Sequence, residues 1–231
     1  MRALALLAVA GVAAIPPSLR GRELDHLPTR KKEVVLTLDA GGDAAGAWSI
    51  LRTLQRKGVV ATFFLTGRWV DQNPALARFI GRRHPVANHT YHHLPLSRVS
   101  DATVVREITT GARSLKKRTG RDPRPLFRFP YGDSNAHVVA IANRLGYVSI
   151  RWTVDTLGWM GGGHQSPAGA VRRVVENLRP GAIILMHVGS AGDADHSTID
   201  AHALPGVIDA VRSRGYTFTG FPASWGRGRR F

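Results

Sequence analysis

No cysteine occurs among the 231 residues of the chain. This absence excludes disulfides, thiolate metal sites and cysteine nucleophiles, so a catalytic site must be built from His, Asp, Glu, Ser or Arg side chains and metal ions. Hydrophobic residues make up 43% of the sequence, which is enough to bury a sizeable core. The length suits one α/β domain.

A long apolar run is also missing. Residues 3–14 form an apolar or small-residue run of 12 residues, whereas a membrane span needs about 20. This run follows Met1-Arg2 and ends in Val12-Ala13-Ala14, a small-residue cleavage site. We therefore expect residues 1–14 to be an export signal, with an uncleaved N-terminal anchor as the alternative. Both interpretations predict a bacterial protein that is secreted or associated with the cell envelope, with no stable membrane span unless this segment stays uncleaved.

Acidic residues are scarce, with 16 Asp and Glu against 32 Lys and Arg, and the formal net charge is +16. Such a charge favours polyanionic partners. The basic residues are scattered and no stacking motif lies between them, so we do not expect nucleic acid as a partner. An anionic cell-wall polysaccharide fits an exported protein better, and we expect the protein to be a monomer.

Strand and helix patterns alternate along the chain, which predicts an α/β fold with a parallel sheet, either open or closed into a barrel. The expected domain covers residues 33–222, between a linker at 15–32 and a frayed basic tail at 223–231. The last helix should be broken or bent near Pro205. The expected strands are 33–38, 59–65, 86–87, 126–129, 147–154, 182–186 and 216–219. The expected helices are 45–57, 74–83, 101–118, 134–146, 167–178 and 199–214.

Polar residues follow several of these strands directly, and the C-terminal edge of a parallel sheet is where active sites are assembled. His89 and His93 are four residues apart, a spacing that lets both imidazoles face one metal ion, while His92 between them should face elsewhere. The other residues at this expected edge are Asp39, Arg128, Asp155 and His187.

Five stretches resemble, in order, the motifs of the NodB-homology polysaccharide deacetylases of carbohydrate esterase family four, and the resemblance covers residues 34–219. It implies a distorted (β/α) barrel with fewer than eight complete units. It also implies a secreted, metal-dependent hydrolase that removes N-acetyl groups from amino sugars in peptidoglycan or chitin-type oligomers. The five stretches are Thr37-Leu38-Asp39-Ala40-Gly41, His89-Thr90-Tyr91-His92-His93, Arg128-Phe129-Pro130-Tyr131-Gly132, residues 155–159, and Leu185-Met186-His187.

The resemblance also implies a role for each residue. Asp39 would be the general base and His187 the general acid, and Arg128 would keep Asp39 ionised and oriented. The main-chain N–H of Tyr131 would donate to the oxyanion. Trp159 and Leu185 would line the acetyl pocket. His89 and His93 would hold a divalent metal ion, zinc or alternatively cobalt.

Two positions depart from the family pattern. The family has a second carboxylate, a metal ligand, directly after the base, and this chain has Ala40 there. Asp43 could replace it beyond the flexible Gly41-Gly42 pair, or the site could be left with two histidines and additional water. The second departure is Gly158, where the family often has an aspartate that tunes the acidic histidine. Asp155 could take over that role.

Other functions fit the same residues. The chain could be a non-catalytic wall-binding protein that lost tight metal binding through Ala40, although Asp39 and His187 would then have no use. It could be an esterase acting on O-acetylated xylan, or a metal-independent hydrolase of another C–N bond.

Overall fold

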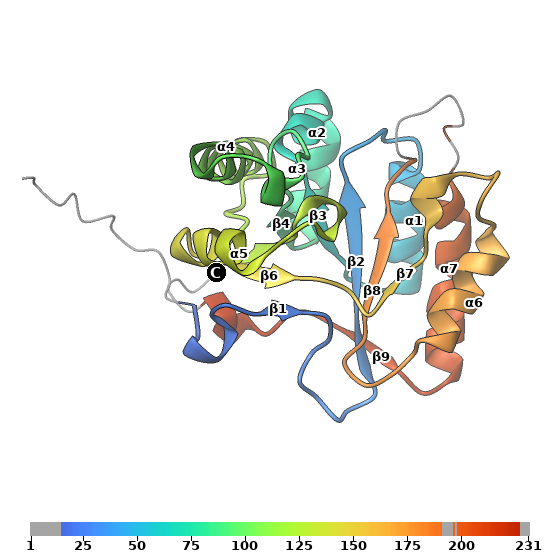
Figure 1. Cartoon of the computed structure of the whole chain (residues 1–231). Coiled ribbons are helices and arrows are strands. Elements are labelled where there is room, and N and C mark those ends of the chain that lie inside the picture. The colour runs from blue at the N-terminus through green and yellow to red at the C-terminus, as the bar shows by residue number, and fades with distance from the viewer. Residues whose placement is uncertain (1–14, 191–195, 197, 227–231) are drawn as a thin grey trace, which may run out of the picture.

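The structure is a computed structural model that describes residues 15–190, 196 and 198–226. Nine strands form one sheet in the order β1-β6-β5-β4-β3-β2-β8-β7, with β9 paired to β2, and every pair of neighbouring strands is parallel. The sheet curls into a half-barrel surrounded by helices (Figure 1). The strands are β1 (Glu23–Leu24), β2 (Glu33–Ala40), β3 (Thr62–Leu65), β4 (Val86–Asn88), β5 (Leu126–Phe127), β6 (Val148–Ile150), β7 (Val154–Asp155), β8 (Ile183–His187) and β9 (Thr217–Thr219).

The helices cover the outside of this sheet, with α6 and α7 packed side by side and α4 packed against α2 and α3 (Figure 1). The α-helices are α1 (Ala47–Lys57), α2 (Gly67–Gln72), α3 (Pro74–Arg83), α4 (Asp101–Thr119), α5 (Ala136–Arg144), α6 (Pro167–Glu176) and α7 (Ile199–Ser213). Short 3-10 turns are η1 (Pro17–Leu19), η2 (Leu96–Arg98), η3 (Pro130–Gly132), η4 (Gly158–Met160) and η5 (Ala223–Gly226). Within the described residues, no helix is long and apolar enough to cross a membrane.

The alternation of side chains along β2 separates the hydrophobic core from the site. Val34, Leu36 and Leu38 join the large core cluster, which also contains buried apolar residues of α1 and α7 such as Leu54 and Val207. Successive side chains of a strand point to opposite faces, so Thr37 and Asp39 lie on the other face, inside the half-barrel. In β8 the same alternation places Leu185 and His187 on one face and puts Met186 in the core.

Most expected elements are present, and three corrections concern the middle and the end of the chain. The expected strand 147–154 is two strands, because β6 pairs with β5 whereas β7 pairs with β8, and residues 151–153 cross between them. Helix α2 was not expected. Helix α7 was expected to be broken or bent near Pro205; a break is excluded, because the helix continues through this residue.

The expected linker at 15–32 is part of the fold. Strand β1 pairs with β6, and a second core cluster contains Ile15, Leu19 and Leu24 together with Trp225. The apolar side chains of this proline-containing segment are therefore buried in the fold. Residues 223–226 of the expected frayed tail form η5. The expected export signal (1–14) and the rest of the basic tail (227–231) lie outside the described residues.

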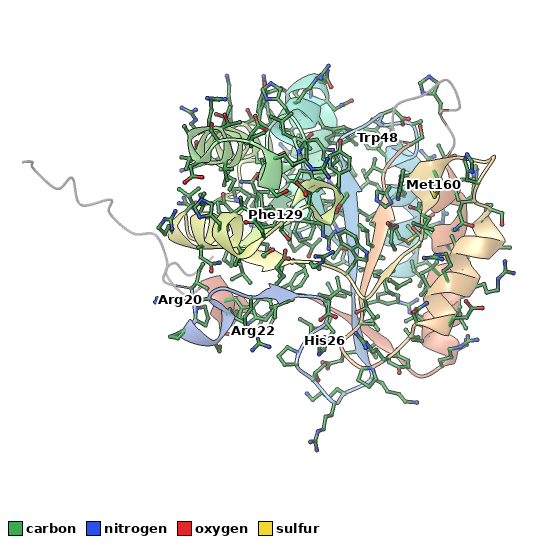
Figure 2. The ribbon with its side chains drawn as sticks, viewed as in Figure 1. Arg20, Arg22, His26, Trp48, Phe129 and Met160 are labelled. Atoms are coloured by element: carbon green, nitrogen blue, oxygen red, sulfur yellow. The ribbon has the colours of Figure 1, made fainter. Side chains whose placement is uncertain are left out.

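Trp48 lies on α1 but outside the hydrophobic core. The residue is 47% exposed (Figure 2). Its ring meets the ring of Phe79 edge to face. The buried side of α1 instead contains Ile50, Leu51 and Leu54.

Candidate active site

The polar residues expected at the strand ends do meet at one edge of the sheet. Asp39 is the penultimate residue of β2, and it is in register with His187, the last residue of β8. His89 follows β4, Arg128 follows β5 and Asp155 ends β7. Five strands therefore contribute side chains to one site at their C-terminal ends, as expected for this kind of sheet.

A buried ion pair anchors the site. The Arg128 side chain is 1% exposed, and its Nη1 donates to Asp39 Oδ1 at 2.5 Å. Its Nη2 donates to Thr37 Oγ1 at 3.1 Å, and its Nε donates to the Ile150 carbonyl at 3.2 Å. The guanidinium also lies 4.0 Å from the centroid of the Phe64 ring. A buried charge that is both paired and hydrogen-bonded in this way is fixed in position, and it fixes the Asp39 carboxylate with it.

The two histidines come from a tight loop that is tied to α4. Buried Glu107 on α4 accepts the main-chain N–H groups of Tyr91 and His92, at 3.2 and 2.7 Å. It also pairs with His92 Nδ1 at 2.7 Å, so His92 faces away from the site as expected. His93 has a left-handed φ of 68°. The loop is therefore held from outside the site while His89 and His93 turn inward.

His89 and His93 approach each other through their ring nitrogens. The two Nε2 atoms are 3.1 Å apart, and His89 Nδ1 lies 2.8 Å from the Arg128 carbonyl oxygen. A carbonyl can only accept, so Nδ1 of His89 is the protonated nitrogen and Nε2 presents its lone pair. His89 Nε2 is also 3.5 Å from Asp39 Oδ2.

The pKa values of both imidazoles are strongly lowered. Burial lowers the pKa of His89 to about 3, the Arg128 carbonyl opposes this shift, and the charge of Arg128 adds to it. Burial and the neighbouring His89 lower the pKa of His93 to about 3, against the opposing charge of Asp39. Both rings are neutral at pH 7, the form in which histidine binds metal ions. Two close, neutral nitrogen donors therefore fit a divalent metal ion such as zinc.

Asp43 does not join the pair. Its carboxylate accepts the Ala45 N–H at 2.8 Å, the Ser190 hydroxyl at 2.8 Å and the Ser190 N–H at 3.2 Å. In the part of the chain that the structure describes, no group of three or more His, Asp or Glu side chains is arranged to hold a metal ion. Hydrogen bonds from Ala45, which precedes α1, and from Ser190, which follows β8, engage the Asp43 oxygens in this arrangement. The role of Asp43 as third ligand therefore stays a prediction.

His187 differs from His89 and His93 because two carboxylates lie close to its ring. Its Nδ1 is 3.3 Å from Asp200 Oδ2 and 3.8 Å from Asp155 Oδ1. Burial lowers its pKa, but the hydrogen bond to Asp200 and the charges of Asp155, Asp200 and Asp39 outweigh this effect and raise the pKa above the ordinary value. Because Nδ1 is engaged, Nε2 is the nitrogen left to exchange a proton with a ligand.

Asp155 is held by its own turn. Its Oδ1 accepts the Leu157 N–H at 2.8 Å and its Oδ2 accepts the Trp159 indole N–H at 3.2 Å. Burial raises the pKa of Asp155, while His187 opposes this shift. The Trp159 ring, 39% exposed, lies 6.5 Å from the His187 ring. Trp159 therefore borders His187, and the buried Leu185 lies on the same face of β8 as His187. Their role in an acetyl pocket stays a prediction.

Tyr131 borders the site on the side of His93. Its ring is 70% exposed and lies 4.5 Å from the His93 ring. Its φ of 60° is left-handed, and the N–H groups of Gly132 and Asp133 close the turn onto Phe129 and Pro130. The N–H of Tyr131 takes no part in those two turn bonds, which leaves it available to a ligand.

The sequence did not reveal two carboxylates of this site. Asp200 lies on α7, where its position near a helix N-terminus is typical of an ordinary capping residue. Glu107 lies within α4, where nothing in the apolar pattern distinguishes it from a surface residue. Only the arrangement in space reveals that both are 2% exposed and bonded to site segments.

The chain is similar to known proteins in sequence and in fold. A family model described as polysaccharide deacetylase matches residues 26–150. A chitooligosaccharide deacetylase of Bradyrhizobium sp. (strain ANU 289) is 32% identical over 199 residues, which cover 83% of this chain and 90% of the relative. A peptidoglycan-N-acetylmuramic acid deacetylase of Bacillus subtilis (strain 168) is 29% identical over 191 residues, which cover 82% of this chain and 70% of the relative.

Solved structures share the fold. The structure of PdaA, a family 4 carbohydrate esterase of Bacillus subtilis, matches with a TM-score of 0.77 at 27% identity, covering 86% of this chain and 82% of that one. A CE4 family pseudoenzyme of Bacillus anthracis matches with a TM-score of 0.76 at 29% identity, covering 86% and 66%. Relatives of this fold thus include both esterases and a pseudoenzyme.

Proposed function

The chain belongs to the polysaccharide deacetylase family, and from this premise we propose that it removes N-acetyl groups from the amino sugars of a polysaccharide. The relatives described above are named for peptidoglycan and for chitooligosaccharide substrates. The net charge of +16 favours peptidoglycan, because a cationic enzyme accumulates on an anionic wall.

The reaction is the hydrolysis of an amide, and the residues of the site divide its proton transfers. Asp39, oriented by Arg128, takes a proton from the attacking water, whose oxygen bonds to the acetyl carbon. The N–H of Tyr131 donates to the oxygen of the tetrahedral intermediate. His187 then gives its proton to the sugar nitrogen as the C–N bond breaks, which leaves acetate and a free amine.

Two further sets of residues complete the proposal. Trp159 and Leu185 border the space for the acetyl methyl group. His89 and His93 would hold a divalent metal ion, with zinc favoured and cobalt possible. A bound metal ion of this kind polarises a carbonyl and lowers the pKa of its water to about 7. With Ala40 in place of a carboxylate, fewer protein ligands are available and the affinity for the metal should be lower.

One observation carries this proposal. Asp39, paired with buried Arg128, and His187, whose pKa is raised, lie in register on the neighbouring strands β2 and β8. A general base and a general acid in adjacent positions are what amide hydrolysis requires.

The test is acetate release from N-acetylglucosamine oligomers and from peptidoglycan by metal-stripped protein, with zinc or cobalt titrated back. Acetylated xylan serves as the comparison substrate for esterase action. We expect metal-restored release from an N-acetylated substrate. Ala40→Asp, assayed in parallel, should bind the metal more tightly, since it adds a carboxylate after Asp39.

A second function, non-catalytic wall binding, is favoured by Ala40 and by the similarity to a pseudoenzyme. It predicts binding of the folded protein to peptidoglycan with no acetate release at saturating metal. The pairing of Asp39 with Arg128 counts against it, because a binding protein needs no buried base.

We also propose that the protein acts outside the cytoplasmic membrane of a bacterium, secreted or associated with the envelope, and as a monomer. The sequence of residues 1–14 supports export. Fractionation of cells that express the full chain, with mass spectrometry of the mature N-terminus, tests export and cleavage together.

A further inference from the structure

Asp200 approaches His187 from a helix that no motif of the sequence includes. It is the second residue of α7, and its side chain is 2% exposed. Oδ2 accepts the main-chain N–H of His187 at 2.7 Å and lies 3.3 Å from Nδ1 of the same residue. One carboxylate oxygen thus contacts both the backbone and the ring of His187.

The space for this carboxylate exists only because residue 158 has no side chain. A Cβ atom built on Gly158 would collide with the carboxyl carbon and both carboxylate oxygens of Asp200. Gly158 is not among the glycines with positive φ, so the backbone does not require glycine there. Asp200 Oδ1 has no hydrogen-bond partner among the described residues. The absence of a side chain at residue 158 therefore provides the space that the Asp200 carboxylate occupies.

We propose that Asp200 is the positioning carboxylate of His187, and that residues 158 and 200 are two alternative origins for one carboxylate at this place. An aspartate at 158 would bring its carboxylate to the space that Asp200 fills, and the two cannot be present together. The catalytic part of this inference rests on the proposed function, in which His187 is the acid.

The other groups near His187 are less suited to this role. Asp155 on β7 is 3.8 Å from Nδ1, and the N–H groups of Leu157 and Trp159 already engage its two oxygens. Asp39 on β2 is paired with Arg128. His89 and His93 also interact with His187, and a positive charge on either would lower its pKa.

The experiment compares Asp200→Asn, the double variant Gly158→Asp/Asp200→Ala, and the matched control Gly158→Ala/Asp200→Ala. Two quantities are measured for each. One is the pKa of His187 by NMR titration of histidine-labelled protein, which needs no activity. The other is the alkaline limb of kcat for acetate release from an N-acetylglucosamine oligomer. Asp200→Asn keeps an oxygen for the main-chain N–H of His187, so it removes the charge with little change of shape.

We expect Asp200→Asn to lower the pKa of His187 and to move the alkaline limb down by about one pH unit, which is a tenfold loss of kcat above that limb. The Gly158→Asp double variant should restore both quantities, and the alanine control should restore neither. An unchanged pKa and limb in Asp200→Asn would overturn the inference, as would recovery in the alanine control. If the double variant does not fold, Asp200→Asn decides alone. If wild type releases no acetate but the pKa of His187 moves as stated, the inference stands and the proposed function fails.

Discussion

The β4 side and the β8 side of the site both use histidine, and their imidazoles differ in proton affinity. On the β4 side, burial lowers the pKa values of His89 and His93 to about 3. On the β8 side, burial acts on His187 in the same direction, but the neighbouring carboxylates raise its pKa. The pKa shifts therefore differ in direction because the neighbouring groups differ. A carbonyl and a guanidinium lie beside His89, whereas three carboxylates surround His187.

This comparison shows why residue type alone does not assign a role. A neutral imidazole is a lone-pair donor and a protonated one is an acid, and the surroundings select between them. The charge of Arg128 is important on both sides, because it opposes protonation of His89 while it pairs with Asp39. Substitutions that remove one partner at a time should therefore affect one side and spare the other.

The largest expected effect comes from substitution of Asp39, which lies between the β4 side and the β8 side of the site. Asp39→Asn removes the base and leaves Arg128 buried without its charged partner. We expect acetate release to fall about 10³-fold and the fold to lose a few kcal/mol of stability. Kinetics at saturating metal and urea unfolding measure the two effects. Activity within tenfold of wild type would exclude Asp39 as the base.

On the β4 side, His93→Gln should weaken zinc binding by about 10- to 100-fold, since it removes one of two imidazole donors. His92→Gln is the matched control in the same loop, because that ring pairs with Glu107 outside the site. Isothermal titration of the metal-stripped variants measures both affinities. Equal losses in the two variants would mean that the loop, and not the His89–His93 pair, determines metal binding.

Asp43→Asn tests whether the third ligand is absent. The Asp43 carboxylate is bonded to Ala45 and Ser190, so we expect zinc affinity to change by less than about threefold and stability to fall by about 1 kcal/mol. Zinc titration and urea unfolding of this variant provide the two values. A loss of affinity as large as that of His93→Gln would show that Asp43 turns to the metal when metal is present.

The sequence allowed much of this architecture to be predicted, because buried parallel strands are continuous apolar runs and their ends carry the polar residues. Asp39, His89, Arg128 and His187 could be assigned to one edge in this way. Asp200 could not, since a contact between the start of α7 and β8 depends on how the helix packs. The expected linker also packs into the fold, because short segments such as β1 have too few residues to show a strand period.

A last prediction tests the cause of this comparison outside the site, where no effect on acetate release is expected. His84 is buried at the end of α3 beside the Phe63 ring, and burial together with the charge of Arg83 lowers its pKa to about 4. Its unfolded-state pKa is about 6.5, so the unfolded chain binds a proton more readily. The stability that comes from a neutral His84 is therefore complete above pH 6.5 and is lost as the pH falls toward 4. From the size of the shift, about 2–3 kcal/mol should be lost over this range.

His84→Gln removes the titration, so urea unfolding at pH 7 and pH 4.5 should show a smaller acid-induced loss of stability in this variant than in wild type. The exposed His164→Gln controls for the removal of one imidazole. If His84→Gln and wild type lose the same stability on acidification, burial without a carboxylate is not sufficient to lower a histidine pKa in this protein, and the low values of His89 and His93 would need another cause.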